Sequence, residues 1–263
     1  MLKERVLSAI VLIPIAFALL YLGGWWFAAL VALFGLVAGY EAYTMLNRRG
    51  YEPFRWWGLA LILGFTVLPL FTSHGRGLLL MLTLGVMLTL VRALPHRSEA
   101  PATDWALTLA VALYLGMGIY YAVLLRLLPR GLWWVLTALL LTWITDSGAY
   151  FIGTSVGRHR MAPRLSPKKT WEGTIGGGVT GVIGACLLAP WLLSLPLAQA
   201  FVLGVFVAVV APLGDLAESM FKRQCGVKDS GHWIPGHGGA FDRIDSLLFV
   251  FPTVYWLALW MAG

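Results

Sequence analysis

Apolar runs close to twenty residues long recur from one end of this chain to the other. A helix needs about 20 consecutive apolar residues to cross the hydrocarbon core of a bilayer. The composition agrees, since 59% of the 263 residues are hydrophobic and only 12% are charged. We predict an all-α, polytopic integral membrane protein, because a soluble domain of this length does not combine so many apolar residues with so few charges.

The apolar runs predict about nine transmembrane helices in a single membrane domain that spans residues 1–263. The expected helices cover residues 6–22, 25–46, 56–72, 77–94, 105–128, 132–152, 173–194, 198–220 and 244–262. No small-residue cleavage site follows the first run, so we expect it to be retained and not removed as a signal peptide. Residues 1–130 contain few motifs and are expected to be a helical scaffold, whereas residues 131–263 hold the expected catalytic helices and loops.

The basic residues indicate the orientation of these helices. When the loops are assigned to alternate sides, all but three of the 19 Lys and Arg residues fall on one side, the exceptions being Arg76, Arg126 and Arg130. By the positive-inside rule that side is cytoplasmic. We therefore expect a cytoplasmic N-terminus, a C-terminus outside, and two long cytoplasmic loops at residues 153–172 and 221–243. The net charge of +7 follows from this topology, so we expect no nucleic-acid partner.

The stretch from Asp215 to Ser246 interrupts the apolar pattern with a dense group of charges. Charged residues packed between membrane helices are costly and usually mark a functional site. Asp215, Glu218, Ser219 and Lys222 are spaced i, i+3, i+4 and i+7, so they share one face of a helix. An apolar helix with a single charged stripe is expected to turn that stripe inward.

Two further carboxylates, Asp242 and Asp245, stand at the start of the last predicted span. We expect them to converge with Asp215 at the cytoplasmic end of the helices. Carboxylates without a cysteine–histidine pattern favour a hard cation such as Mg²⁺, with substrate phosphates completing its coordination. The alternative is that Asp242 and Asp245 only begin the helix and form ion pairs with Arg243 or Arg223.

The segment upstream of residue 173 has features of a phosphate site. Ser166-Pro167 predicts a turn, and Thr170 is a candidate N-cap of the following helix. Lys168 and Lys169 precede a glycine-rich helix start, where free backbone N–H groups can bind an anion. The same glycines can instead serve close packing between membrane helices.

Two other positions have both a functional and an ordinary explanation. Asp146 falls late in an apolar span, where a carboxylate either ends the helix at the interface or lines the site. His237, Gly238 and Gly239 belong to a glycine loop whose backbone can approach a nucleotide. His237 either contacts substrate or is a loop histidine with a local partner.

The run from Ser219 to Asp245 closely resembles the signature of the CDP-diacylglycerol synthases, also called phosphatidate cytidylyltransferases. The positions that carry the resemblance are Ser219, Lys222, Arg223, Lys228, Asp229, Gly231, Pro235, Gly236, His237, Gly238, Gly239, Asp242, Arg243 and Asp245. Residues 146–150 and 166–173 resemble a second block of that family. The N-terminal half is similar only as a set of hydrophobic spans.

The resemblance implies a multi-pass enzyme of the bacterial inner membrane, usually a homodimer, with its active site on the cytoplasmic side. It implies transfer of a cytidylyl group from CTP to phosphatidic acid, giving CDP-diacylglycerol and pyrophosphate. By position, it assigns Asp215, Asp242 and Asp245 to a Mg²⁺ centre, with K⁺ as a candidate second cation. The expected catalytic residues are Lys222, Arg223, Lys228, Asp242 and Arg243. The expected substrate-binding residues are Asp146, Ser166, Lys168, Lys169, Ser219, His237, Gly238 and Gly239.

Two other functions remain open from the sequence. A CTP-dependent transferase acting on an isoprenoid or ether lipid would use the same headgroup chemistry. A secondary transporter also carries intramembrane carboxylates and broken helices. However, transporter sites lie near the membrane midplane and their folds often repeat, whereas the charges here crowd the predicted cytoplasmic ends and no repeat is visible.

Overall fold

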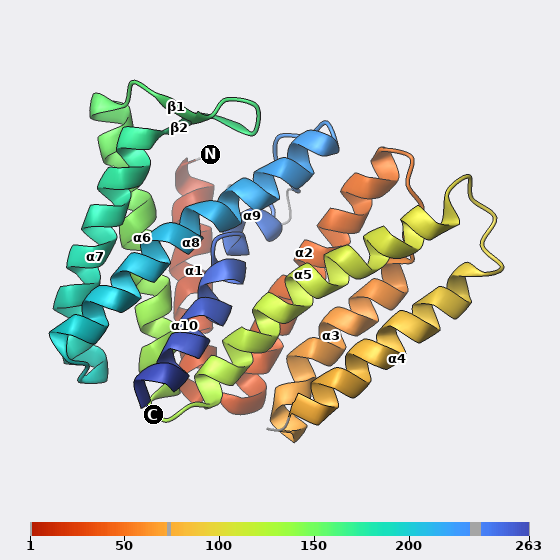
Figure 1. The fold of residues 1–263 in the computed structure, drawn as a ribbon, viewed down its shortest axis with the longest axis horizontal. Coiled ribbons are helices and arrows are strands. Elements are labelled where there is room, and N and C mark those ends of the chain that lie inside the picture. Colours follow the sequence, from red (N-terminus) through yellow and green to blue (C-terminus); the bar gives the residue numbers. More distant parts are fainter. Residues whose placement is uncertain (1, 73–74, 232–237, 263) are drawn as a thin grey trace. The chain divides into compact units, whose positions relative to one another are not determined.

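The structure is a computed structural model that describes residues 2–72, 75–231 and 238–262, and these residues are almost entirely helical (Figure 1). The helices are α1 (Leu2–Leu22), α2 (Gly24–Arg48), α3 (Arg55–Phe71), α4 (Gly75–Ala93), α5 (Pro101–Leu127), α6 (Gly131–Val156), α7 (Trp171–Leu193), α8 (Leu197–Gln224), α9 (Phe241–Ile244) and α10 (Leu247–Ala262). Long helices thus lie where the apolar runs predict them, to within a few residues. The last predicted helix, residues 244–262, begins at Leu247 as α10, and the separate short helix α9 precedes it.

Seven helical stretches in the described part of the chain are long and apolar enough to cross a membrane. They are α2, α5, α6, α7, α8, residues 76–93 of α4, and the stretch Phe241–Met261. The apolar part of α1 (Ile13–Leu22) and the helix α3 are shorter. The chain is therefore an α-helical polytopic membrane protein, and the expected count of nine spans stays a prediction.

The chain folds as two compact units, which we describe separately. The first contains Met1–Leu124 and Gln224–Ile244, and the second contains Leu125–Arg223 and Asp245–Gly263. The boundary near residue 125 lies close to the division that the sequence suggested at residue 130. However, residues 224–244 group with the N-terminal helices and not with the rest of the expected catalytic part. A single membrane domain stays a prediction.

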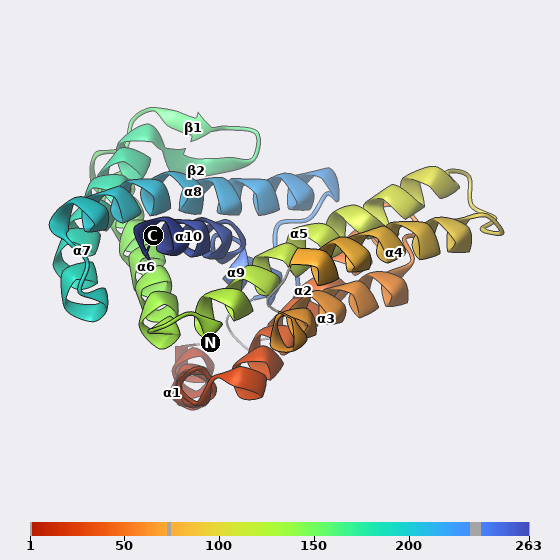
Figure 2. The same cartoon turned by 60° about the horizontal axis from the view of Figure 1, so that its bottom comes forward.

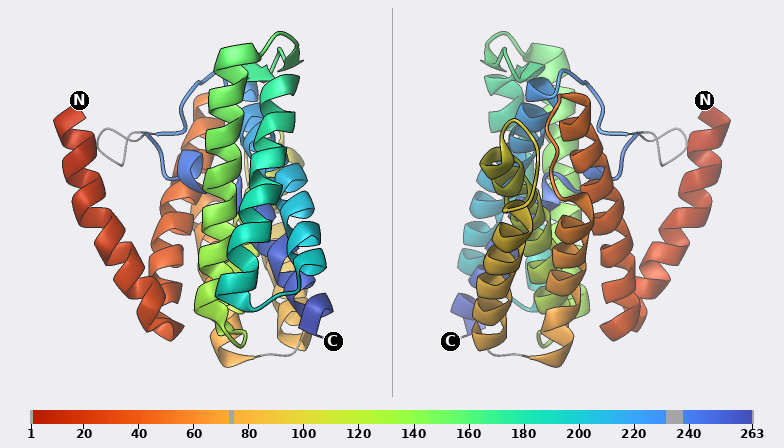
Figure 3. Two further views of the ribbon diagram at one scale, coloured as in Figure 1. Left: turned by 90° about the vertical axis from the view of Figure 1, so that its left-hand side faces the viewer. Right: turned by 90° about the vertical axis from the view of Figure 1, so that its right-hand side faces the viewer.

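In the first unit, α2 packs closely against α3 and α5. Gly35 makes this approach possible, because a Cβ atom there would lie 2.1 Å from Ile119 Cδ1 of α5 and 3.2 Å from Ile62 Cγ2 of α3. Tyr43 of α2 is completely buried and donates a 2.7 Å hydrogen bond to the carbonyl oxygen of Thr108. Figure 3 shows that α1 and α2 form a V that opens away from their junction.

In the second unit, α6 and α7 lie side by side (Figure 3). Glycines of α7 allow the close approach, since a Cβ atom on Gly177 would lie 2.5 Å from the carbonyl oxygen of Thr145. A Cβ atom on Gly173 would lie 2.8 Å from the carbonyl oxygen of Ala149. The packing explanation for these glycines is therefore confirmed.

A short antiparallel hairpin connects α6 and α7, formed by β1 (Arg160–Ala162) and β2 (Ser166–Thr170). The predicted turn at Ser166-Pro167 was wrong, because Ser166 already belongs to β2. The chain turns at residues 163–165 instead, where Leu165 N donates to the Ala162 carbonyl oxygen at 3.1 Å. Pro163 favours this turn, since its fixed φ angle suits the second turn position. The cap prediction is confirmed, because Thr170 Oγ1 accepts a hydrogen bond from Gly173 N at 3.2 Å.

Candidate active site

Three carboxylates of the second unit come together where α8 passes the start of α10. Asp215 and Glu218 lie one turn apart on α8, and Asp245 stands two residues before α10. One carboxylate oxygen from each lies within 4.8 Å of the other two. Gly214 permits this arrangement, because a Cβ atom there would lie 2.6 Å from the backbone oxygen of Asp245. The backbone of α8 therefore runs directly against the turn that carries Asp245.

The charged stripe of α8 turns inward, as the spacing predicted. Glu218 is 0% exposed, Ser219 is 5% exposed and Lys222 is 8% exposed. Ser219 Oγ donates to Asp215 at 3.4 Å, and Lys222 Nζ lies 2.5 Å from a Glu218 oxygen. Glu218 thus takes part in the cluster, although the sequence analysis had placed it only on the stripe.

A second lysine reaches the cluster from the hairpin. Lys169 of β2 forms an ion pair with Asp215, and its Nζ also donates to the carbonyl oxygen of Pro212 at 3.4 Å. Arg223, near the end of α8, is exposed and donates from Nε to the carbonyl oxygen of Leu165 at 3.0 Å. These contacts place the hairpin along α8 (Figure 2).

Asp146 of α6 adds a fourth carboxylate to this region, because the charges of Lys169 and Asp215 act on it. Oxygen donors without sulfur or imidazole suit a hard divalent cation. The carboxylates of Asp215, Glu218 and Asp245 therefore fit a Mg²⁺ ion in donor type.

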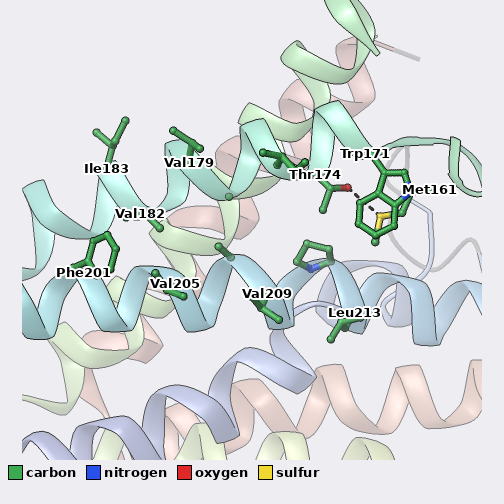
Figure 4. Close-up of a pocket in the computed structure, with 14 residues that line it drawn as sticks. Met161, Trp171, Thr174, Val179, Val182, Ile183, Phe201, Val205, Val209 and Leu213 are labelled. Carbon is green, nitrogen blue, oxygen red and sulfur yellow. Dashed lines mark hydrogen bonds between the residues drawn. The ribbon is translucent and has the colours of Figure 1, made fainter. Parts of the chain in front are cut away.

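An apolar groove runs between α7 and α8 and reaches Leu213 of α8, which lies two residues before Asp215. It has a volume of about 700 Å³ and lies between the two helices, as Figure 4 shows. Met161 and Trp171 line one end, and Ile183 and Phe201 line the other. Lys169 Nζ donates to the carbonyl oxygen of Pro212, a residue that lines the groove, so the cationic side chain lies next to this apolar surface.

Asp242 lies in a different polar cluster, within the first unit. Its Oδ2 atom accepts hydrogen bonds from Ser230 N at 3.1 Å, Ser230 Oγ at 2.9 Å and Gly239 N at 3.1 Å. These donors hold the carboxylate against the residues that precede α9. A role for Asp242 in metal binding stays a prediction.

Glu41 of α2 belongs to this second cluster, and the sequence analysis missed it. The side chain is 2% exposed and accepts hydrogen bonds from Ala240 N, Phe241 N and Ser230 Oγ at 2.9–3.1 Å. A signal was present, because a carboxylate within an apolar membrane helix is costly and often functional. Because residues 1–130 were assigned as a whole to a scaffold, the charge of Glu41 was not considered as a sign of function.

The remaining predicted residues have less defined surroundings. Ser166 of β2 is partly buried, and Gly238 has a φ angle of 83°, which favours glycine. Lys168, Lys228 and Arg243 are exposed. His237, together with Pro235 and Gly236, lies outside the described residues.

Comparison with known proteins gives a consistent result over the full length of the chain. The chain matches the Cytidylyltransferase family over residues 3–261. The phosphatidate cytidylyltransferase of Bacillus subtilis is 33% identical over 261 residues, which cover 97% of each chain. The enzyme of the same name from Synechocystis is 36% identical and covers 97% of this chain and 96% of the relative. The Pseudomonas aeruginosa protein, with the same name, is 37% identical and covers 100% of this chain and 98% of the relative. The chain therefore belongs to the cytidylyltransferase family.

Proposed function

We propose that this protein is a membrane nucleotidyltransferase that transfers a cytidylyl group from CTP to phosphatidic acid, giving CDP-diacylglycerol and pyrophosphate. The observation that carries the proposal is the cluster of Asp215, Glu218 and Asp245, in which Glu218 is buried and the other two are partly buried, with two lysines beside it. Relatives named phosphatidate cytidylyltransferase align with nearly the whole chain, which supports the same substrates here.

The reaction joins two anions, so charge neutralisation is the main task of the site. An oxygen of the lipid phosphate forms a bond to the α-phosphorus of CTP, and the bond from that phosphorus to the pyrophosphate oxygen breaks. The attacking phosphate is already ionised near neutral pH, so no strong general base is needed. Lys169 and Lys222 lie where they can offset phosphate charge and orient the two reactants.

Asp215, Glu218 and Asp245 would hold a divalent cation, for which we propose Mg²⁺. When bound, the ion supplies Lewis-acid stabilisation of the phosphoryl oxygens. We also propose that Asp242 contributes to this centre and that K⁺ is a second cation. Further proposed contacts to CTP or to the lipid phosphate come from Asp146, Ser166, Lys168, Ser219, Arg223, Lys228, His237, Gly238, Gly239 and Arg243.

The lipid substrate needs an apolar surface beside the charged site, because its tails stay in the bilayer. We propose that the groove between α7 and α8 receives an acyl chain while Lys169 faces the phosphate headgroup. We further propose nine membrane spans, a cytoplasmic N-terminus and active site, a C-terminus outside, and a homodimer in the inner membrane. The distribution of basic residues supports this orientation.

The test uses the purified full chain in detergent micelles, with labelled CTP and phosphatidic acid, in the presence and absence of Mg²⁺. We expect a labelled liponucleotide that requires Mg²⁺. We expect no detectable product from Asp215→Asn or Asp245→Asn, whereas Arg48→Ala, a basic residue at the end of α2, serves as the control and stays active. The absence of any lipid-linked cytidine product would refute the proposal. Faster transfer to an isoprenoid phosphate would identify the other lipid class as the substrate.

A further inference from the structure

We propose that Glu41 is a positioning residue for the reaction: its carboxylate fastens both ends of the segment from Ser230 to Phe241 and thereby orients Asp242. The inference rests on the proposed function, because it assigns Glu41 a role in that reaction. Glu41 lies outside the signature from Ser219 to Asp245. The hydrogen bonds from which it is argued all lie within the first unit. Its basis is a set of hydrogen bonds between α2 and residues about 200 positions later in the chain.

The carboxylate of Glu41 joins two stretches that are separated in the sequence by residues 231–239. Ser230 Oγ donates to Glu41 Oε2 at 2.9 Å on one side of that separation. On the other side, Ala240 N donates to Oε1 at 3.1 Å and Phe241 N donates to Oε2 at 3.0 Å. Glu41 therefore holds the beginning and the end of the glycine-rich segment at one point.

Two glycines of the signature make room for this carboxylate. A Cβ atom on Gly231 would lie 2.3 Å from Glu41 Oε1. On Gly239 it would lie 1.9 Å from Ser230 Oγ and 2.6 Å from Glu41 Oε2. Real Cβ atoms do not approach other atoms so closely, so both positions require glycine while Glu41 is in place.

Ser230 connects Glu41 to Asp242. Its hydroxyl oxygen lies 2.9 Å from Glu41 Oε2 and 2.9 Å from Asp242 Oδ2. A hydroxyl has one hydrogen, so the two carboxylates share a single donor. The Asp242 oxygen also accepts from Ser230 N and Gly239 N, both at 3.1 Å. A change at Glu41 thus reaches Asp242 through a residue that contacts both.

The chemistry requires a carboxylate at position 41, and not merely a side chain of that size. Both oxygens face N–H or O–H donors, so both must be acceptors. Glutamine has nearly the same shape, but one end of its amide is a donor. In either orientation, its NH₂ group would face the N–H of Ala240 or of Phe241. A buried donor facing a donor leaves both unsatisfied, which is costly.

The test compares Glu41→Gln and Ser230→Ala with Glu52→Gln, the same chemical change on a side chain that is 64% exposed. For each purified variant, kcat, the KM values for CTP and phosphatidic acid, and the Mg²⁺ concentration for half-maximal activity are measured per mole of folded protein. We expect Glu41→Gln to lower kcat or raise the Mg²⁺ requirement by about 10- to 100-fold, the usual range for residues that orient a site. Ser230→Ala should shift the same parameters, and the double variant should be no worse than Glu41→Gln alone, since both act on Asp242. Glu52→Gln should match the wild type.

The result that overturns the inference is normal kcat and Mg²⁺ dependence per folded molecule of Glu41→Gln. This outcome includes a variant that folds in lower yield but turns over normally, because Glu41 would then only stabilise the fold. Additive effects of Glu41→Gln and Ser230→Ala would also exclude the proposed connection through Ser230. Failure of the proposed function is distinguishable, because the wild type itself would then make no CDP-diacylglycerol.

Discussion

Lys222→Met tests whether the buried ion pair on α8 is an electrostatic unit. The variant removes the ammonium group that lies 2.5 Å from Glu218 and keeps an unbranched side chain of similar length. The Glu218 side chain is 0% exposed and that of Lys222 is 11% exposed, so water cannot replace the lost partner without rearrangement. The remaining carboxylate would lose its nearest positive charge.

Removing one member of a buried pair costs about 3–5 kcal/mol, whereas replacing both by neutral groups of similar volume is often close to neutral. For a globular domain of about 150–250 residues, 1 kcal/mol shifts the melting temperature by about 2–4 °C. We therefore expect Lys222→Met to lower Tm by about 6–20 °C. The double variant Glu218→Gln/Lys222→Met should recover most of that loss.

The assay is thermal unfolding of the detergent-solubilised protein, followed by tryptophan fluorescence. Arg223→Met is the matched control, since the neighbouring Arg223 is exposed and donates a hydrogen bond to the carbonyl oxygen of Leu165. Loss of this exposed hydrogen bond should lower the free energy of unfolding by no more than about 1.5 kcal/mol. Mg²⁺ at about 100 times its Kd should raise the free energy of unfolding of Lys222→Met by about 2.7 kcal/mol. A double variant that is less stable than Lys222→Met alone would refute the reasoning.

Three further outcomes follow from the packing and from the signature. Gly177→Val should lower the free energy of unfolding by about 1–3 kcal/mol, because its Cβ atom would meet Thr145 and Ala149 at 2.5–2.7 Å. Gly178→Val is the control for it, since the nearest atom there is Ala208 Cβ at 3.5 Å, and an equal loss would argue against tight α6–α7 packing. Burial raises the pKa of the Cys225 thiol, so less thiolate forms at neutral pH, and maleimide labelling should be slow in the native protein and should speed up on denaturation or at higher pH. Equal labelling rates before and after denaturation would contradict this. Asp242→Asn should insert and fold but lose cytidylyl transfer, and normal turnover would remove Asp242 from the metal role.

The sequence predicted what depends on local pattern. Apolar runs predicted the long helices, the i, i+3, i+4, i+7 spacing predicted the inward stripe of α8, and Thr170 was identified as a cap because capping involves only the next few residues. The prediction for the loop between α6 and α7 was less accurate. Pro163 and Pro167 both favour turns, and only strand pairing decides which of them turns the chain.

Of the contacts between distant residues, the sequence analysis predicted that Asp215 meets Asp245, but it missed those of Glu41 and Glu218. Glu41 looks like an isolated charge in an apolar helix until its partners, about 200 residues later, are known. Glu218 was visible on the stripe, but its place beside Asp245 depends on how closely α8 passes the start of α10 at Gly214. Such proximity arises from packing, and a single sequence does not encode it in any local spacing.

The path of the chain between the two units limits how this protein can be divided. Gln224–Ile244 belong to the first unit, although residues of the second unit precede and follow them in the sequence. A cut at residue 125 would therefore not yield two complete units. A fragment ending there would retain Glu41 in α2 but lose Ser230, Ala240 and Phe241, the donors that satisfy its carboxylate. Truncation studies, fusion designs and split reporters should therefore keep the polypeptide continuous through Gln224–Ile244.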